Sequence, residues 1–117
     1  KSYREDPFSP RNALVLGFGP FALSKFFGTN RVVAVFRSPV SMGLHVSSMG
    51  GAAWSLARSG VDAVAIEGRS DDPAIILIEG DGRDVRVRKE VIERRELERL
   101  FAPRPGGRYG TVTLTEY

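Results

Sequence analysis

The chain has 117 residues, which fits one domain, and 42% of them are hydrophobic, enough to form a core. With 26% charged residues and a formal charge of +3, its composition is neither that of a disordered chain nor that of a membrane-embedded one. The absence of cysteine excludes disulfides, a thiolate nucleophile and any cysteine-held zinc or iron–sulfur site within these residues.

Two short apolar runs predict the first strands. Residues 13–18 indicate a strand that enters a turn at Gly19-Pro20, and residues 32–36 a β-branched strand typical of a sheet covered on both faces. Residues 17–22 also match the dinucleotide fingerprint G-x-G-x-x-A, with Arg37 ending the next strand, where it could meet a phosphate. The crossover is too short for a complete helix, and Pro20 removes a backbone donor, so a glycine-rich turn is favoured over a nucleotide site.

The middle of the chain predicts a helix over residues 47–60. A serine at either of its first two positions can cap it, Gly60 ends it, and Trp54 is expected in the core. Gly50-Gly51 leaves room for a ligand near the backbone, and the N–H groups of a helix start favour an anion. On the residues alone, an anion-facing site and tight helix–sheet packing are equally good interpretations.

The remaining elements complete an α+β pattern. Residues 61–67 predict a strand, and residues 74–78 and 85–88 a hairpin around Gly80-Asp81-Gly82. Residues 89–101 predict a second helix from their apolar stripe. A loop over residues 103–107 and a strand over residues 111–115 are expected after it. The order of elements predicts a β-rich sheet domain with packed helices, a single domain over residues 1–117 that is truncated at its C-terminal end.

The sequence contains no recognisable catalytic or metal-binding pattern. His45 has no partner at metal-ligand spacing, and no Ser-His-Asp set or carboxylate pair can be argued. No basic stripe carries interleaved aromatics, and no apolar run could cross a bilayer. We therefore expect a cytoplasmic protein with no catalytic residue of its own and with neither nucleic acid nor membrane as partner. The arginine-rich basic set and the absence of Cys and Gln fit a thermophile.

Four motifs in series resemble the N-terminal domain of the tungsten-pterin aldehyde:ferredoxin oxidoreductase family. In chain order they are residues 6–12 (DPFSPRN), 17–20 (GFGP), 37–39 (RSP) and 47–53 (SSMGGAA), and residues 60–69 continue the match. The combination is most similar to the branch of the family that oxidises glyceraldehyde 3-phosphate. Each motif is weak alone, and their order and spacing carry the resemblance.

The resemblance implies a base for a tungsten bis-pterin cofactor with magnesium. It implies that Arg31 and Gly50 contact a pterin, and that the backbone carbonyl of Ser48 is a ligand of the magnesium ion bridging the pterin phosphates. Better-known members carry Asn at the position of Ser48, a change that keeps the carbonyl. These roles agree with the guanidinium fork of arginine, the hard oxygen ligands of Mg²⁺ and the space beside a glycine.

The resemblance also implies that further domains belong to the parent enzyme. These domains would supply a [4Fe–4S] cluster, the acid/base residues and the second half of the cofactor site, and ferredoxin would accept the electrons from aldehyde oxidation. The chain alone is then expected to be inactive. The alternative is a free-standing, non-catalytic binding or scaffold module derived from that domain.

Overall fold

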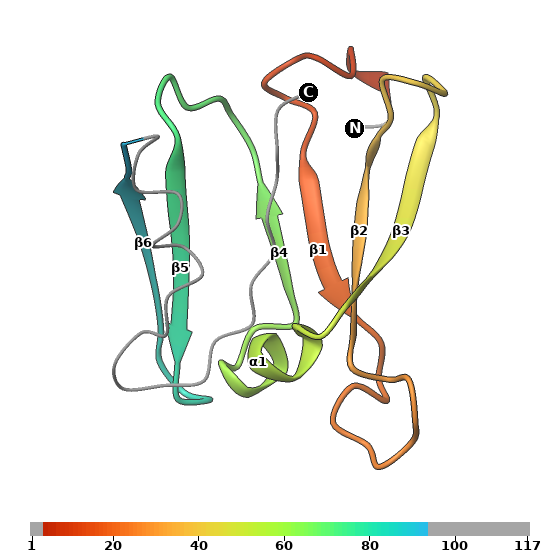
Figure 1. Ribbon diagram of the computed structural model, residues 1–117, viewed down its shortest axis with the longest axis vertical. Helices are drawn as coiled ribbons and strands as arrows, with labels where there is room; N and C mark the ends of the chain where they lie inside the picture. Colours follow the sequence, from red (N-terminus) through yellow and green to blue (C-terminus); the bar gives the residue numbers. More distant parts are fainter. Residues whose placement is uncertain (1–3, 94–117) are drawn as a thin grey trace.

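The computed structural model describes residues 4–93, which form a four-stranded antiparallel sheet, one short helix and a two-stranded hairpin (Figure 1). The sheet contains β1 (Leu14–Phe18), β2 (Arg31–Arg37), β3 (Leu44–Gly50) and β4 (Ala63–Ile66); the helix is α1 (Ala53–Arg58), and the hairpin joins β5 (Ala74–Gly80) to β6 (Val85–Val91). This sheet-rich architecture confirms the predicted α+β class.

The four-stranded sheet is a Greek key. Its spatial order is β3-β2-β1-β4, so three consecutive strands form a meander and β4 returns to lie beside β1. The return connection contains α1. The helix lies across the end of the sheet where β1 and β3 end and where β2 and β4 begin (Figure 1). The loop between β1 and β2 extends beyond this same end.

One face of the sheet is covered. Val32 and Ala34 of β2 are buried on it, and Val32 packs in a cluster with Ala22, Ala52 and Ala53. Burying these small apolar side chains under α1 provides the hydrophobic stabilisation of this end of the molecule. The cluster is completed by half-buried side chains from β1 and β3, which are Leu16, Phe18 and Met49.

The opposite face, which we call the open face, is uncovered in the described residues. Its residues follow from the strand register and are Val15 and Gly17 of β1, Arg31, Val33, Val35 and Arg37 of β2, Leu44, Val46, Ser48 and Gly50 of β3, and Ala63 and Ala65 of β4. All of them are exposed or half-exposed. The prediction that β2 belongs to a sheet covered on both faces is therefore wrong for this part of the chain.

The helix predicted over residues 47–60 is wrong in its first part, because residues 47–50 are the end of a strand. Residues up to Gly50 belong to β3, which pairs with β2 along its whole length, and α1 begins only at Ala53. The two serines therefore cap nothing, and pairing in the sheet overrides their local preference for a helix start. The predicted stop is confirmed, because Gly60 follows the helix with φ +86°, a backbone conformation that glycine adopts without strain.

The hairpin packs against the end of α1 through backbone contacts. A Cβ at Gly60 would lie 3.0 Å from the Cα of Gly82. In the turn, the backbone N–H groups of Asp84 and Arg83 donate to the Asp81 carboxylate, at 3.0 and 2.9 Å, and lower its pKa. Because a side chain at Gly60 would collide with the backbone of Gly82, glycine is needed where the hairpin meets the end of α1.

The C-terminal expectations are only partly tested by the structure. β6 continues to Val91, and residues 92 and 93 are not helical either, so the helix predicted over residues 89–101 is wrong for its first five residues. Residues 94–101 of that helix, and the loop and strand predicted at 103–107 and 111–115, lie outside the described residues. Over the described range, no helix has the length and apolar character needed to span a membrane.

Candidate functional site

The three residues implied as a cofactor site lie close together on the open face. Arg31 begins β2 and is paired directly with Gly50, the last residue of β3. Ser48 lies two residues before Gly50 and is paired with Val33. Because side chains alternate along a strand and paired residues share a face, all three occupy one end of the open face.

The backbone carbonyl of Ser48 points to the free edge of the sheet. Directly opposed residues of an antiparallel pair alternate between hydrogen-bonded and non-hydrogen-bonded pairs. The Gly51 N–H donates to the carbonyl of Asn30 at 3.0 Å, so this pair is hydrogen-bonded, and counting along the register makes Val33 and Ser48 a non-hydrogen-bonded pair. The Ser48 carbonyl therefore faces away from β2. Since β3 is the end strand of the sheet, that oxygen is available as a metal ligand.

The two arginines at the ends of β2 have different surroundings. Arg37 donates from Nε to the Met42 carbonyl at 3.1 Å and from Nη1 to the Glu5 carbonyl at 2.6 Å. Its guanidinium therefore holds two chain segments together, and it is not placed to receive a nucleotide phosphate. Arg31 is exposed, and within the described part of the chain its side chain has no hydrogen bond or ion pair. A free guanidinium can donate two parallel hydrogen bonds to an anion.

Gly50 leaves open space on the face. A Cβ built on it would have no other heavy atom within 4 Å, so the glycine is not required for packing within the described chain. Gly51 differs, because its φ of +81° is left-handed and favours glycine for the chain to turn from β3 into α1. Of the two interpretations of this glycine pair, tight packing does not apply to Gly50 within the described residues, and Gly51 has a conformational role.

The predicted anion site at a helix start is corrected. Gly50 and Gly51 precede α1, and the Gly51 N–H is already bonded to Asn30. α1 also has only six residues, so the alignment of its peptide dipoles is short. What Gly50 offers is space at the end of an edge strand.

Sequence reasoning missed Asn30, which fixes this end of the site. Its side-chain Oδ1 accepts the Trp54 N–H at 2.9 Å, and its Nδ2 donates to the Gly51 carbonyl at 3.3 Å. The Ala52 N-cap supplies no side-chain hydrogen bond, so Asn30 caps α1 from another part of the chain. An asparagine immediately before a strand was the only sequence signal. Trp54, expected in the core, is 45% exposed.

We expect Asn30→Ala to lower the free energy of unfolding by about 1–2 kcal/mol, because it removes a cap and leaves the Trp54 N–H without its acceptor. Amide hydrogen exchange at Trp54 should become faster. Asn12→Ala is a matched control, because Asn12 accepts the Arg37 N–H at 3.0 Å and donates to the Arg37 carbonyl at the other end of β2. It should speed exchange at Arg37 and leave Trp54 unchanged. If each variant sped hydrogen exchange equally at Trp54 and at Arg37, the two asparagines would not have separate roles at the two ends of β2.

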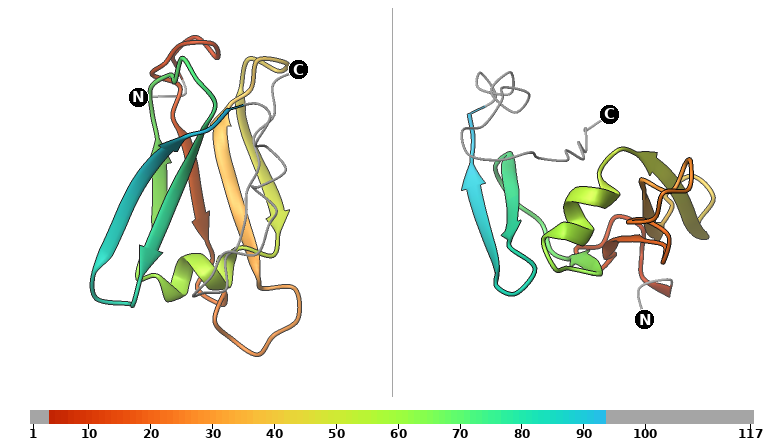
Figure 2. Two further views of the ribbon diagram at one scale, coloured as in Figure 1. Left: turned by 60° about the vertical axis from the view of Figure 1, so that its left-hand side comes forward. Right: turned by 90° about the horizontal axis from the view of Figure 1, so that it is seen from below.

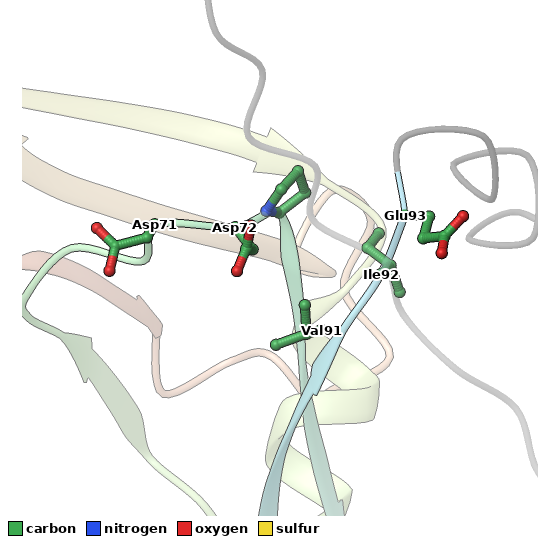
Figure 3. Close-up of a pocket in the computed structure, with 6 residues that line it drawn as sticks. Asp71, Asp72, Val91, Ile92 and Glu93 are labelled. Atoms are coloured by element: carbon green, nitrogen blue, oxygen red, sulfur yellow. The ribbon is translucent and has the colours of Figure 1, made fainter.

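The other candidate sites in the described part of the chain do not bring together a set of ligand-binding side chains. An open hollow beside the hairpin is lined by Asp71, Asp72, Pro73, Val91, Ile92 and Glu93, but its labelled carboxylates point in different directions (Figure 3). In residues 4–93 no group of three or more His, Asp or Glu side chains could hold a metal. The rings of His45 and Phe36 are in contact at a tilt of 45°, with their centroids 5.1 Å apart.

The nucleotide interpretation is also excluded by topology. The fingerprint needs parallel strands joined by a helix, whereas β1 and β2 pair antiparallel and are joined by turns.

Comparisons with known proteins identify the family of the chain. Residues 2–109 match the family described as "Aldehyde ferredoxin oxidoreductase, N-terminal domain". The chain is 38% identical, over its full length, to the glyceraldehyde-3-phosphate:ferredoxin oxidoreductase of Pyrococcus furiosus, of which it covers 18%. It is 28% identical over 107 residues to a tungsten-containing aldehyde ferredoxin oxidoreductase of Pyrococcus horikoshii, covering 89% of the chain and 18% of that relative. The chain thus spans less than a fifth of the length of either relative.

Proposed function

Since the chain belongs to the aldehyde ferredoxin oxidoreductase family as an N-terminal domain, we propose that its open face carries the tungsten bis-pterin cofactor of a larger oxidoreductase. One observation carries this proposal. The free guanidinium of Arg31, the space at Gly50 and the edge-facing carbonyl of Ser48 lie together at one end of that face. A flat, anionic ligand with an associated cation fits this set of groups.

Each residue has a distinct task in the proposal. Arg31 donates hydrogen bonds to the acceptor atoms of a pterin or its phosphate, and its fixed positive charge attracts the anion. Gly50 lets the ligand approach the main chain closely. Ser48 offers a carbonyl oxygen, the ligand type that Mg²⁺ prefers. When bound, the tungsten cofactor supplies the oxidation of an aldehyde to a carboxylic acid.

The parent activity that we propose is oxidation of glyceraldehyde 3-phosphate with ferredoxin as electron acceptor, in the cytoplasm. The 38% identity to a relative named for this substrate and acceptor supports it. The remaining domains of the parent supply what these 117 residues lack, including the cysteines of a [4Fe–4S] cluster, because the chain contains no cysteine. The chain alone is accordingly expected to be inactive.

Replacing Arg31 by Ala in the full-length parent tests the proposal. The tungsten and pterin content of the purified protein should fall about tenfold or more, since a hydrogen bond to a charged group contributes about 1.5–3 kcal/mol and each 1.4 kcal/mol of lost binding reduces affinity tenfold. The melting temperature of the cofactor-free protein should stay unchanged, because the Arg31 side chain is exposed and unpaired in the described chain.

Arg37→Ala is the matched control from the same strand and the same face. It removes two hydrogen bonds to backbone carbonyls, so it should lower the melting temperature more than it lowers the cofactor content of the folded protein. Unchanged tungsten in the Arg31 variant would refute the proposed role of this end of the open face.

A further inference from the structure

The loop between β1 and β2 exposes a group of large apolar side chains. We call residues 19–30 the aromatic loop. Phe26 is 68% exposed and Phe27 is fully exposed, and Phe21 and Leu23 are also exposed. Leu23, Phe26 and Phe27, together with Trp54 of α1, border a hollow that Lys25 and Arg58 also line. The loop extends beyond the end of the sheet (orange in Figures 1 and 2).

Local hydrogen bonds fix the aromatic loop in this conformation. The Ala22 N–H donates to Gly19 at 3.0 Å, the Ser24 N–H donates to Phe21 at 2.9 Å, and the Thr29 hydroxyl donates to Phe26 at 2.9 Å. Ala22 is buried in the core cluster, and the rings of Phe21 and Phe26 meet edge to face at 5.7 Å. The loop backbone and the rings of Phe21 and Phe26 are therefore held in place before any partner binds, which reduces the entropy cost of contact.

The charged side chains that line the hollow are both cationic. No Asp or Glu occurs between Asp6 and Asp62, and the cations in that stretch include Lys25 and Arg58 of the hollow. Contiguous apolar patches of this kind mark interaction sites, and aromatic and arginine side chains are enriched in interface cores. The complementary surface carries apolar side chains together with acidic ones.

The position of the loop indicates where that surface comes from. The aromatic loop ends immediately before Arg31, so it borders the end of the open face at which the proposed cofactor site is incomplete. The polypeptide that completes the site must lie against this end. More than four-fifths of the length of the 38% identical relative lies outside the match, so such a polypeptide is present in the relative.

We propose that the aromatic loop and Trp54 are covered by an acidic, apolar segment of the remaining polypeptide of the same parent protomer. This inference rests on the proposed function, because it takes the chain to be one domain of a larger enzyme. The loop then serves as the contact that holds this domain against the domains that complete the site.

Hydroxyl-radical footprinting of the full-length parent tests the coverage directly. Phe26, Phe27 and Trp54 should be modified at least about tenfold more slowly in the native protein than in the unfolded one, since a buried ring loses most of its contact with water. Modification of these rings at the unfolded rate would overturn the inference. Protection that disappears when an oligomer is diluted to protomers would assign the surface to a second copy and would also overturn it.

Two variants of the parent test the chemistry of the contact. Phe27→Ala should lower the melting temperature by several degrees without changing the oligomeric mass; an altered mass at an unchanged melting temperature would count against an intramolecular contact. Lys25→Glu should lower the melting temperature more than Arg69→Glu, which makes the same charge change at an exposed site with no ion pair in the described part of the chain. Equal decreases in melting temperature for the two variants would contradict an acidic partner surface. Tungsten content of the unmodified parent, measured on the same preparation, tests the proposed function separately.

Discussion

Gly50→Val in the full-length parent is expected to lower tungsten and pterin content to less than about a tenth of the normal value, since each 1.4 kcal/mol of lost binding reduces affinity tenfold. The valine methyl groups would occupy the space through which a bulky ligand approaches the main chain. The fold itself should remain intact. A Cβ at this position meets nothing within 4 Å, and a β-branched residue is favourable in a strand.

The neighbouring glycine provides the control. Gly51 has a φ of +81°, so Gly51→Ala should lower the free energy of unfolding by about 1–2 kcal/mol through backbone strain. Ser48→Ala retains the backbone carbonyl and should retain magnesium and tungsten. Metal analysis and thermal unfolding of the three variants separate the effects. Full cofactor content in Gly50→Val, or its failure to fold, would show that this glycine has another role.

Gly80→Ala is expected to cause the largest loss of stability, about 3 kcal/mol, the upper range for an overpacked site. The added Cβ would overlap the carbonyl oxygen of Ser59 and lie 2.9 Å from its carbonyl carbon. Both groups belong to the backbone, so neither can rotate away. Relief requires the hairpin of β5 and β6 to separate from the end of α1. Urea denaturation of the protein measures the change.

Gly19→Ala is the matched control for this substitution. Gly19 has no atom within 4 Å of a built Cβ and no left-handed φ, so its replacement should change stability by less than about 0.5 kcal/mol. If Gly80→Ala were equally silent, the contact between hairpin and helix would not contribute to stability.

The strands were predictable where local composition and sheet pairing agree. The β-branched run of β2 and the hairpin signal before β6 predicted elements that the structure contains. β3 was missed because its serines and glycine are typical of a helix start. Its strand conformation comes from pairing with β2, and a single sequence does not show that pairing.

Motifs supplied the candidate site residues but not their geometry. Arg31, Ser48 and Gly50 came from motifs, and the motifs did not show that the three share one face at a free sheet edge. The role of Asn30 could not be predicted, because its partners Gly51 and Trp54 are brought near only by the fold. Long-range hydrogen bonds of a side chain leave no periodic pattern in the sequence.

The Greek key order of the strands also determines which strand pairs can form first while the chain is being synthesised. Arg31 and Gly50 are paired within the hairpin of β2 and β3, whose contacts are local in sequence. The second partner of β1 is β4, which ends at Ile66, so that pairing joins residues about fifty positions apart in the sequence. Local contacts form faster than distant ones, and domains fold from the N-terminus while the chain is being made. The pair of strands that would meet the cofactor can therefore assemble on the ribosome before the strand that closes the other side of the sheet has emerged from it.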